Sequence, residues 1–287
     1  IRDGFLVTAL FWIVLGLFGA IPLWITPQLD LSPIAAIFES ISGLTTTGAT
    51  VITGLDALPR SLLLYRQLLQ WLGGIGIIVL AVAILPMLGI GGMQLYRAES
   101  AGPSKDRKLT PRITSTAKAL FGIYLLLTVA CALSYFAAGM SPFDALCHAF
   151  STVAIGGFST HDASLGYYEE NAILLVSSLF MLFSAINFGL HFVALQRRTA
   201  RVYARDSETA FFVTVIALAT VVTCSLLLTT ETLGVEDSLI HGFFQTISIA
   251  TTTGFTTQDF SIWPLFLPIL LLMLSFMGVP PMSRGLW

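Results

Sequence analysis

Long apolar runs are the feature that most constrains how this chain can fold. A helix needs about 20 mainly apolar residues to cross a bilayer, and the sequence contains five runs of roughly this length and a shorter sixth. They are Phe5–Ile25, Leu62–Leu88, Ile113–Ala138, Ala172–Leu195, Ala210–Thr229 and Ile262–Val279. Only 10% of the 287 residues are charged, whereas a soluble domain carries about 25%. The sequence therefore predicts an all-α integral membrane protein that has lipid as its main solvent.

The composition and motifs argue against several other classes of protein. A net charge of −2 gives no basis for nucleic-acid binding. Cys131, Cys147 and Cys224 lie in apolar runs without CxxC spacing, which favours buried side chains over disulfides or a transition-metal site. Neither HExxH nor GxSxG occurs, so nothing in the sequence indicates an enzyme or a covalent cofactor.

The distribution of charge predicts the orientation in the membrane. With the N-terminus in the cytoplasm, eleven Lys and Arg residues fall on the cytoplasmic side, only Arg60 and Arg66 fall outside, and Arg284 lies at the end. The positive-inside rule therefore favours a cytoplasmic N-terminus. The other side carries acidic residues that would concentrate arriving cations, unless they are ordinary solvated loop charges. They are Asp30, Asp56, Asp162, Glu169, Glu170, Glu231, Glu236, Asp237 and Asp259.

A repeated pattern lies between the apolar runs. Pro33–Leu44, Pro142–Ser151 and Ser238–Ile249 are semi-apolar stretches of 10–12 residues, a length that suits re-entrant or interfacial helices. A loop rich in Thr and Gly follows each of them: TTTGAT at 45–50, AIGGFST at 154–160 and TTTGFTT at 251–257. Gly48, Gly157 and Gly254 fall in register, 109 and 97 residues apart, so we interpret the chain as three copies of one unit.

Loops of this kind suit a path for cations. Irregular backbone at membrane depth is tolerated only where it is buried in protein or lines a water-filled path. Glycine adopts positive φ without strain, so that successive carbonyls can face one axis and replace the hydration shell of a monovalent cation. The short helix before each loop would direct the negative end of its dipole at the ion.

Four segments carry a resemblance to a known family. FESISGLTTTGAT, QWLGGIGIIVLAVAILPML, STVAIGGFST and TTTGFTT resemble the pore subunits of the Trk/Ktr/HKT potassium-transport superfamily, and within it the bacterial TrkH branch. The resemblance implies tandem membrane helix–pore helix–membrane helix (M1–P–M2) repeats with re-entrant selectivity-filter loops, arranged like a potassium channel. It implies repeat 1 at 1–98, a cytoplasmic linker at 99–111, repeat 2 at 112–198, a second linker at 199–207 and an incomplete repeat 3 at 208–287.

The resemblance also implies a function and a site. The function is potassium uptake across the bacterial inner membrane, and glycine in all three loops implies potassium, whereas serine in the first would go with sodium. The implied ion-binding residues are Thr46, Thr47, Gly48, Ile155, Gly156, Gly157, Thr252, Thr253 and Gly254. The implied partners are a second copy of the chain and a cytosolic TrkA-like subunit. A nucleotide would act only by binding to that subunit. Arg97–Arg112 and Arg197–Arg205 are candidate docking segments for that subunit. The alternative for Arg97–Arg112 is a solvated linker that lies against anionic lipid.

The chain departs from the family pattern at its end. A fourth repeat is absent, and the sequence stops soon after Val279-Pro280-Pro281, so we expect a truncated product or a fragment. Three quadrants would not close a four-fold filter, which leaves a non-conducting remnant as an alternative. A Na⁺- or H⁺-coupled symporter is a further alternative, but the apolar runs are almost free of the ionisable residues that coupling needs.

Several polar residues within the apolar segments are further candidates. Glu39 is expected to support the first filter loop, with a solvated residue at the pore mouth as the alternative. His148 and His241 are expected to take equivalent places in the second and third short helices, without binding a metal. Asn187 and His191, an i, i+4 pair, are expected to make interhelical hydrogen bonds.

A glycine cluster in the second apolar run has two possible interpretations. Gly73, Gly74 and Gly76 follow no predicted strand, which argues against a dinucleotide-binding loop. They are therefore expected to allow close helix packing.

Overall fold

The computed structural model describes residues 2–83 and 113–276, which form helices and the loops between them. Three units follow one another, each with a long helix, a short helix, a loop and a second helix. The first comprises α1 (Arg2–Ile25), α2 (Pro33–Leu44) and α3 (Arg60–Ala83); the second α5 (Ile113–Ala137), α6 (Pro142–Ala154) and α7 (Asn171–Ala185); the third α10 (Ser207–Thr229), α11 (Val235–Ala250) and α12 (Phe266–Ser275). The connections hold α8 (Phe188–Arg197), α9 (Arg201–Arg205) and the 3₁₀ turns η1 (Leu55–Ala57), η3 (Ser164–Tyr167) and η4 (Phe260–Ile262).

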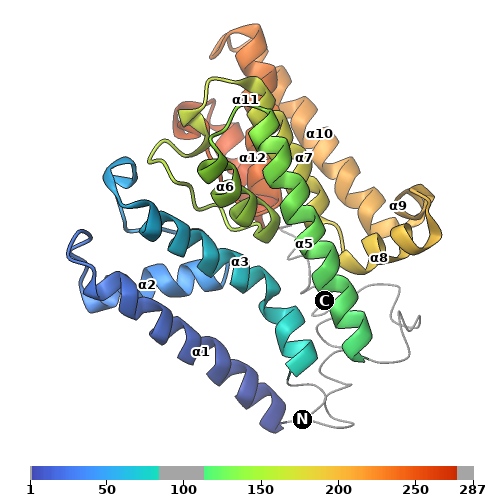
Figure 1. Cartoon of the computed structure of the whole chain (residues 1–287). Coiled ribbons are helices and arrows are strands. Elements are labelled where there is room, and N and C mark those ends of the chain that lie inside the picture. Colours follow the sequence, from blue (N-terminus) through green and yellow to red (C-terminus); the bar gives the residue numbers. More distant parts are fainter. Residues whose placement is uncertain (1, 84–112, 277–287) are drawn as a thin grey trace.

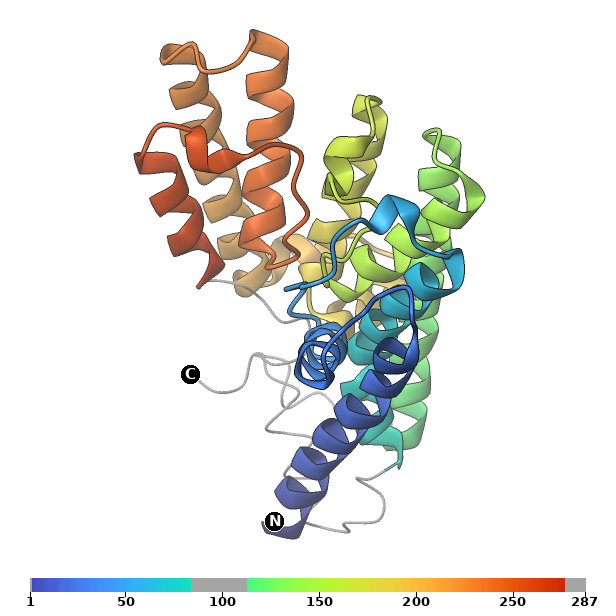
Figure 2. The ribbon, with the colours of Figure 1, turned by 90° about the vertical axis from the view of Figure 1, so that its left-hand side faces the viewer.

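In each of the first two units, the helix that follows the loop packs on the short helix of the next unit. The helix α3 contacts α6, and α7 contacts α11, so that the helices of the second unit lie between those of the first and third (Figures 1 and 2). One large apolar cluster joins the second and third units and reaches back to Ile75 of α3. A smaller cluster packs α1 and α2 against Leu69. The prediction of an all-α protein of tandem units is confirmed for the described residues.

The start of two short helices follows from local sequence. Ser32 and Ser141 each stand directly before a proline at the first helical position, and their side chains accept hydrogen bonds from the N–H groups of Ala35 and Asp144. A serine cap satisfies an unpaired N–H of the first turn, and proline has no N–H to leave unsatisfied there. These signals explain why the predicted start at proline agrees with α2 and α6, whereas α11 has a Gly cap and starts three residues earlier than predicted.

The glycine cluster of α3 packs closely, as predicted. A Cβ atom on Gly73 would overlap the carbonyl group of Leu44, and one on Gly76 would meet the Trp12 ring. A Cβ on Gly74 would lie 2.5 Å from the Tyr124 hydroxyl. The three glycines therefore let α3 approach α1, α2 and α5 at once. The three cysteines are buried and free, as expected.

The fourth apolar run is not one straight helix, and this part of the prediction is wrong. The helices α7 and α8 meet at an angle of 93° because the Asn187 side chain accepts a hydrogen bond from Gly189 N–H at 2.8 Å and caps a new helix. Asn187 therefore caps the helix on which His191 lies. His191 bonds to the Phe183 carbonyl of α7 and to the Tyr203 hydroxyl of α9, both at 2.9 Å, so the interhelical hydrogen bonds predicted for it are confirmed.

Length and composition identify two described helices that could cross a membrane, Lys118–Ala137 within α5 and Ser207–Thr229. The bent pair α7–α8 would be a third if it counts as one span. The predicted runs Leu62–Leu88 and Ile262–Val279 extend beyond the described residues. Many large apolar side chains face outward, among them Phe18 on α1 and Leu218 on α10, which are 67% and 63% exposed. Such surfaces suit lipid as the surrounding solvent.

Candidate ion-binding site

The loops that follow the three short helices share one backbone conformation. Thr46, Ile155 and Thr252 have φ values of 54°, 54° and 61°, and the glycines two residues later, Gly48, Gly157 and Gly254, have φ values of 77°, 83° and 83°. The residues between them, Thr47, Gly156 and Thr253, are not among those with positive φ. Backbone with φ of alternating sign can present successive carbonyl oxygens to one cation, as in potassium-channel filters. The nine predicted filter residues thus form three matching segments.

The three short helices end with equivalent hydrogen bonds. The N–H groups of Thr47, Gly156 and Thr253 donate to the carbonyls five residues back, at 2.9, 2.8 and 2.9 Å. This bond, around a left-handed residue, is the motif with which many helices end. The usual residue at the left-handed position is glycine, and here it is Thr46, Ile155 or Thr252. The sequence analysis includes these three residues in the predicted filter but does not predict their left-handed conformation.

A serine six residues before each filter glycine supports the loop. Ser42 and Ser248 donate hydrogen bonds of 2.6 Å to the carbonyls of Ala49 and Phe255, the residues that follow the filter glycines. In the second unit the equivalent hydroxyl, Ser151, donates instead to the side chain of Gln70 on α3. The serine of the second unit therefore bonds to the first unit, whereas the other two serines bond to the loop of their own unit.

A buried polar residue lies nine positions before each filter glycine. Glu39, His148 and Gln245 all have an exposed fraction of 0%. Thr50 donates to Glu39 at 2.9 Å, and Val51 N–H donates to the other carboxylate oxygen at 3.0 Å. His148 Nε2 lies 3.0 Å from the Ser159 hydroxyl, at the place equivalent to Thr50.

The predicted equivalence of His148 and His241 is wrong by one helical turn. His241 bonds to Thr257, three residues after its filter glycine, and corresponds to Asp144, which accepts from Thr160. Both histidines lie on short helices, as predicted, and bond to loop hydroxyls. The described residues contain no group of three or more His, Cys, Asp or Glu that could hold a metal ion.

Neighbouring loops fit together through their glycines. A Cβ atom on Gly48 would overlap the Gly156 carbonyl oxygen, and one on Gly157 would overlap the Thr253 carbonyl oxygen. The same contact thus joins loop 1 to loop 2 and loop 2 to loop 3. No described atom outside its chain neighbours lies within 4 Å of a Cβ built on Gly254. Glycine is required at 48 and 157 both for its positive φ and for this close approach.

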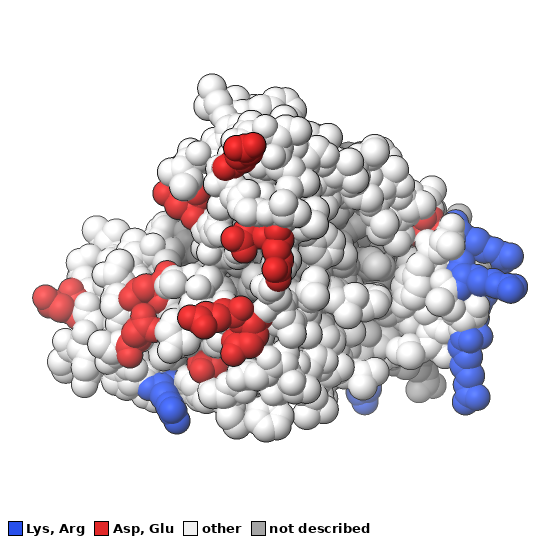
Figure 3. Space-filling model, turned by 90° about the horizontal axis from the view of Figure 1, so that it is seen from above, with Lys and Arg blue, Asp and Glu red and all other residues white. Residues whose placement is uncertain are grey.

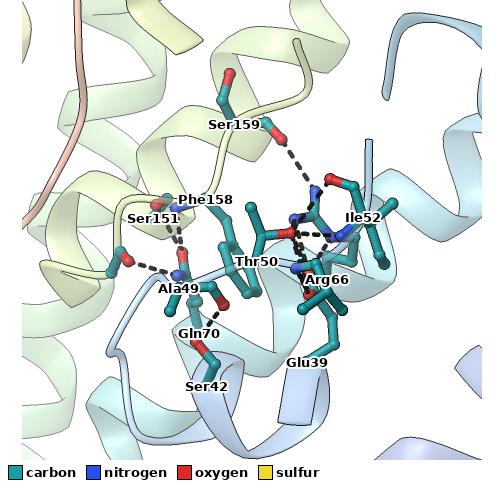
Figure 4. Close-up of polar contacts among 12 residues, drawn as sticks. Glu39, Ser42, Ala49, Thr50, Ile52, Arg66, Gln70, Ser151, Phe158 and Ser159 are labelled. Carbon is teal, nitrogen blue, oxygen red and sulfur yellow. Dashed lines mark hydrogen bonds and ion pairs between the residues drawn. The ribbon is translucent and has the colours of Figure 1, made fainter. Parts of the chain in front are cut away.

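A buried ion pair ties the first and second loops together. Arg66 and Glu39 have side chains 1% and 0% exposed, and Arg66 Nη2 lies 2.8 Å from Glu39 Oε1. Arg66 also donates to Thr50 Oγ1 at 3.0 Å and to the Ser159 carbonyl at 3.3 Å, and its guanidinium carbon lies 4.4 Å from the centre of the Phe158 ring (Figure 4). Arg66, which the sequence analysis counts on the outer side, is thus a buried residue whose charge is paired with Glu39.

The segments beyond the filter join the units a second time. Asp162 of the second unit accepts hydrogen bonds from Gly54 and Leu55 N–H groups of the first, both at 3.0 Å. His161 bonds to Asp56 through Nδ1 and stacks on Tyr167 with ring centres 3.5 Å apart. The hydrogen bond from His161 is the main reason that the pKa of Asp56 lies below its ordinary value of 3.8. Two acidic residues from the predicted outer surface thus connect the first and second units.

Acidic side chains gather on the face seen in Figure 3, whereas basic side chains lie mainly at its rim. Acidic and basic side chains are thus separated in this view. Arg197 ends α8 and Arg205 ends α9, while Arg97–Arg112 lies outside the described residues.

Comparison with known proteins identifies the family. A sequence model described as "TrkH: Cation transport protein" matches residues 1–286. The chain belongs to the TrkH family. It is 60% identical over 284 residues to the Trk system potassium uptake protein TrkH of Halomonas elongata, and 54% identical over 286 residues to that of Escherichia coli. These alignments cover 99% of the chain and 59% of each relative.

A solved structure is similar throughout the chain. The crystal structure of the potassium transporter TrkH from Vibrio parahaemolyticus matches with a TM-score of 0.86 and 52% sequence identity, over 99% of this chain and 58% of that one. The chain is thus a multi-pass membrane protein of the TrkH family and spans somewhat more than half the length of the relatives it matches. The relatives are named as uptake proteins.

Proposed function

We propose that this chain forms three sides of a potassium-selective pore and serves potassium uptake across the bacterial inner membrane. The observation that carries the proposal is the filter contact, in which the glycine of one loop fits against a carbonyl of the next. Two such contacts join three backbone segments of equal conformation, as a ring of carbonyl ligands requires. The relatives at 54–60% identity are potassium uptake proteins.

The proposed ligands are backbone carbonyl oxygens, and potassium is the transported ion rather than a resident cofactor. The carbonyls would come from Thr46, Thr47, Gly48, Ile155, Gly156, Gly157, Thr252, Thr253 and Gly254. Glycine at 48 favours potassium because a serine there would place its Cβ on the Gly156 oxygen. A displaced carbonyl would alter the distances at which a dehydrated ion is held, and filters depend on these distances and on the number of carbonyls.

The proposed orientation puts the N-terminus in the cytoplasm and the acidic face outside. An acidic outer face would raise the local concentration of potassium before it enters the pore. The arginines near the ends of α8 and α9 would then lie at the cytoplasmic side, in line with the positive-inside rule. The proposed partners there are a TrkA-like cytosolic subunit, which would bring any regulatory nucleotide, and a second copy of the chain. Arg97–Arg112 and Arg197–Arg205 are the proposed docking segments for that subunit.

Growth on low potassium tests the proposal. A bacterium that lacks its potassium-uptake systems would express the chain alone or a full-length chimaera, in which the chain is completed by the segments of the H. elongata relative that it does not span. We expect the chimaera to restore growth. If the chain alone also restores growth, it conducts without those segments; if it does not, the chain alone is non-conducting.

Failure of a well-expressed chimaera to restore growth would refute the proposal. A proton uncoupler separates a passive pore from a coupled symporter, because uptake through a passive pore follows the imposed potassium gradient and membrane potential after the proton gradient is removed. Loss of uptake at a constant imposed potential would favour the symporter.

A further inference from the structure

The side chain of Gln70 makes its hydrogen bonds with the short helix and the filter loop of the following unit. Gln70 lies on α3 of the first unit and is 0% exposed. Its Nε2 donates to the Gly156 carbonyl at 2.6 Å, and its Oε1 accepts from Ser151 Oγ at 2.7 Å and from Phe158 N–H at 3.1 Å (Figure 4). One side chain therefore spans the end of the second short helix, a filter residue and the residue just after the filter glycine.

The chemistry of these partners fixes the orientation of the amide. Phe158 N–H can only donate and the Gly156 carbonyl can only accept, so exchange of the oxygen and nitrogen of Gln70 would break both bonds. Gly156 also has no room for a side chain, because a Cβ there would overlap the Gln70 amide carbon. The contact is thus specific in both polarity and shape.

This arrangement occurs in one unit only among those described. In the first and third units, Ser42 and Ser248 donate to the carbonyl that follows their own filter glycine. In the second unit Ser151 donates to Gln70 instead. The position of the second filter loop is therefore set by α3 of the first unit, which makes the filter asymmetric.

We propose that Gln70 is a positioning residue that determines cation selectivity by holding the Gly156 carbonyl at a fixed place beside Gly48. The Gly156 oxygen accepts from the Gln70 amide and would overlap a Cβ atom on Gly48, so its position affects how closely loops 1 and 2 can approach. A carbonyl that is held in this way does not close around an ion smaller than potassium. The proposal rests on the proposed function, since it assigns these loops to a cation path.

The substitution Gln70→Met tests the role of the amide. Methionine is similar in volume and apolar, so it removes the three hydrogen bonds with little change in packing. The control is Gln67→Met on the same helix: Gln67 is also 0% exposed, but neither of its amide atoms has a hydrogen-bond partner among the described residues. Gln70→Glu is a second variant, which keeps an acceptor for Ser151 and Phe158 but, as a carboxylate, has no donor for Gly156.

Two measurements on the full-length chimaera decide the proposal. The first is hydrogen exchange of the amides at 151–160 in purified protein, and the second is uptake of K⁺ in competition with Na⁺. For Gln70→Met we expect exchange to be faster and the K⁺ preference to fall about five- to tenfold, equivalent to about 1–1.4 kcal/mol at 25 °C. Gln70→Glu should lose the preference while the Phe158 amide stays protected, and Gln67→Met should change neither quantity.

Each other outcome has a definite meaning. Unchanged exchange in Gln70→Met, or equal changes in Gln67→Met, would overturn the positioning role. Faster exchange with an unchanged preference would overturn the role in selectivity. If the unsubstituted chimaera takes up no K⁺, the proposed function fails, and a comparison of exchange at 151–160 in K⁺ and in Na⁺ still tests Gln70. The inference is supported if K⁺ but not Na⁺ slows exchange of these amides in the unsubstituted protein, and if Gln70→Met abolishes this effect. Equal exchange in K⁺ and Na⁺ in the unsubstituted protein would overturn it.

Discussion

Loss of Arg66 should destabilise the protein far more than loss of an exposed arginine on the same helix. In Arg66→Met, the Glu39 carboxylate would stay buried without a counterion, keeping only the donors from Thr50 and Val51. Removal of one partner of a buried ion pair costs about 3–5 kcal/mol. A typical domain has about 5–15 kcal/mol of stability in total, so this one change should remove a large part of it.

A double variant separates the charge from the packing. In Glu39→Gln with Arg66→Met no charge is left buried, and the new amide oxygen can still accept from Val51 N–H. We expect this variant to be at least about 2 kcal/mol more stable than Arg66→Met alone, a coupling typical of residues in direct contact. The control is Arg60→Met. Arg60 is exposed and its guanidinium carbon lies 5.4 Å from the centre of the Phe143 ring, a contact that contributes about 0.5–1 kcal/mol.

The assay is the unfolding free energy in detergent micelles, measured by circular dichroism during titration with a denaturing detergent. Arg66→Met should unfold at a much lower denaturant fraction than Arg60→Met, and the double variant should lie between them. The reasoning is refuted if Arg66→Met and Arg60→Met are equally stable, or if the double variant is no more stable than Arg66→Met.

Three further predictions concern other sites. Gly157→Ala should lower potassium uptake by the chimaera about tenfold or more. The new Cβ would overlap the Thr253 oxygen, and residue 157 has a φ of 83°, which strains alanine. The control Gly122→Ala, at a position with open space around it, should not lower uptake. Asp56→Asn should lower thermal stability slightly at pH 7 and by less at pH 3. A lowered carboxyl pKa stabilises the fold above its ordinary value of 3.8, and this contribution is lost as the pH falls through the lowered value. An equal deficit at both pH values would contradict this. His191→Ala should lower the free energy of unfolding by about 1–3 kcal/mol and speed proteolysis at residues 186–203, because it removes hydrogen bonds to Phe183 and Tyr203. An unchanged rate of cleavage would contradict this.

The short helices and the register of the loops could be predicted because their signals are local. Ser-Pro at the start of α2 and α6 and the in-register glycines each depend on a few neighbouring residues. The close packing of Gly73, Gly74 and Gly76 was also predictable, since small residues clustered within an apolar run are typical of close helix contacts.

The partners of buried polar residues could not be predicted, because they lie far apart in the sequence. Arg66 looks like an external basic residue until Glu39, 27 residues away, is placed beside it. Gln70 meets Gly156 across 86 residues. The signal that was available is the type of residue, since an ionisable or amide side chain within an apolar run needs a buried partner.

The break between α7 and α8 was missed because hydropathy alone does not detect it. Residues 172–195 are predominantly apolar, but Asn187 is a preferred residue at a helix start and caps the second segment. A search for capping residues within the run would have found it. The repeat boundaries at 98, 111, 198 and 207 stay predictions.

Anomalous diffraction from crystals of the full-length chimaera grown with Rb⁺ or Tl⁺ tests the central claim most directly. These ions are close to K⁺ in size and can be located individually. We predict density for the ion beside the carbonyls of Thr46–Gly48, Ile155–Gly157 and Thr252–Gly254, and its loss when Na⁺ replaces the heavier ion. Density that lies only elsewhere, or no ordered ion at these carbonyls, would contradict the assignment of the three loops as a potassium filter.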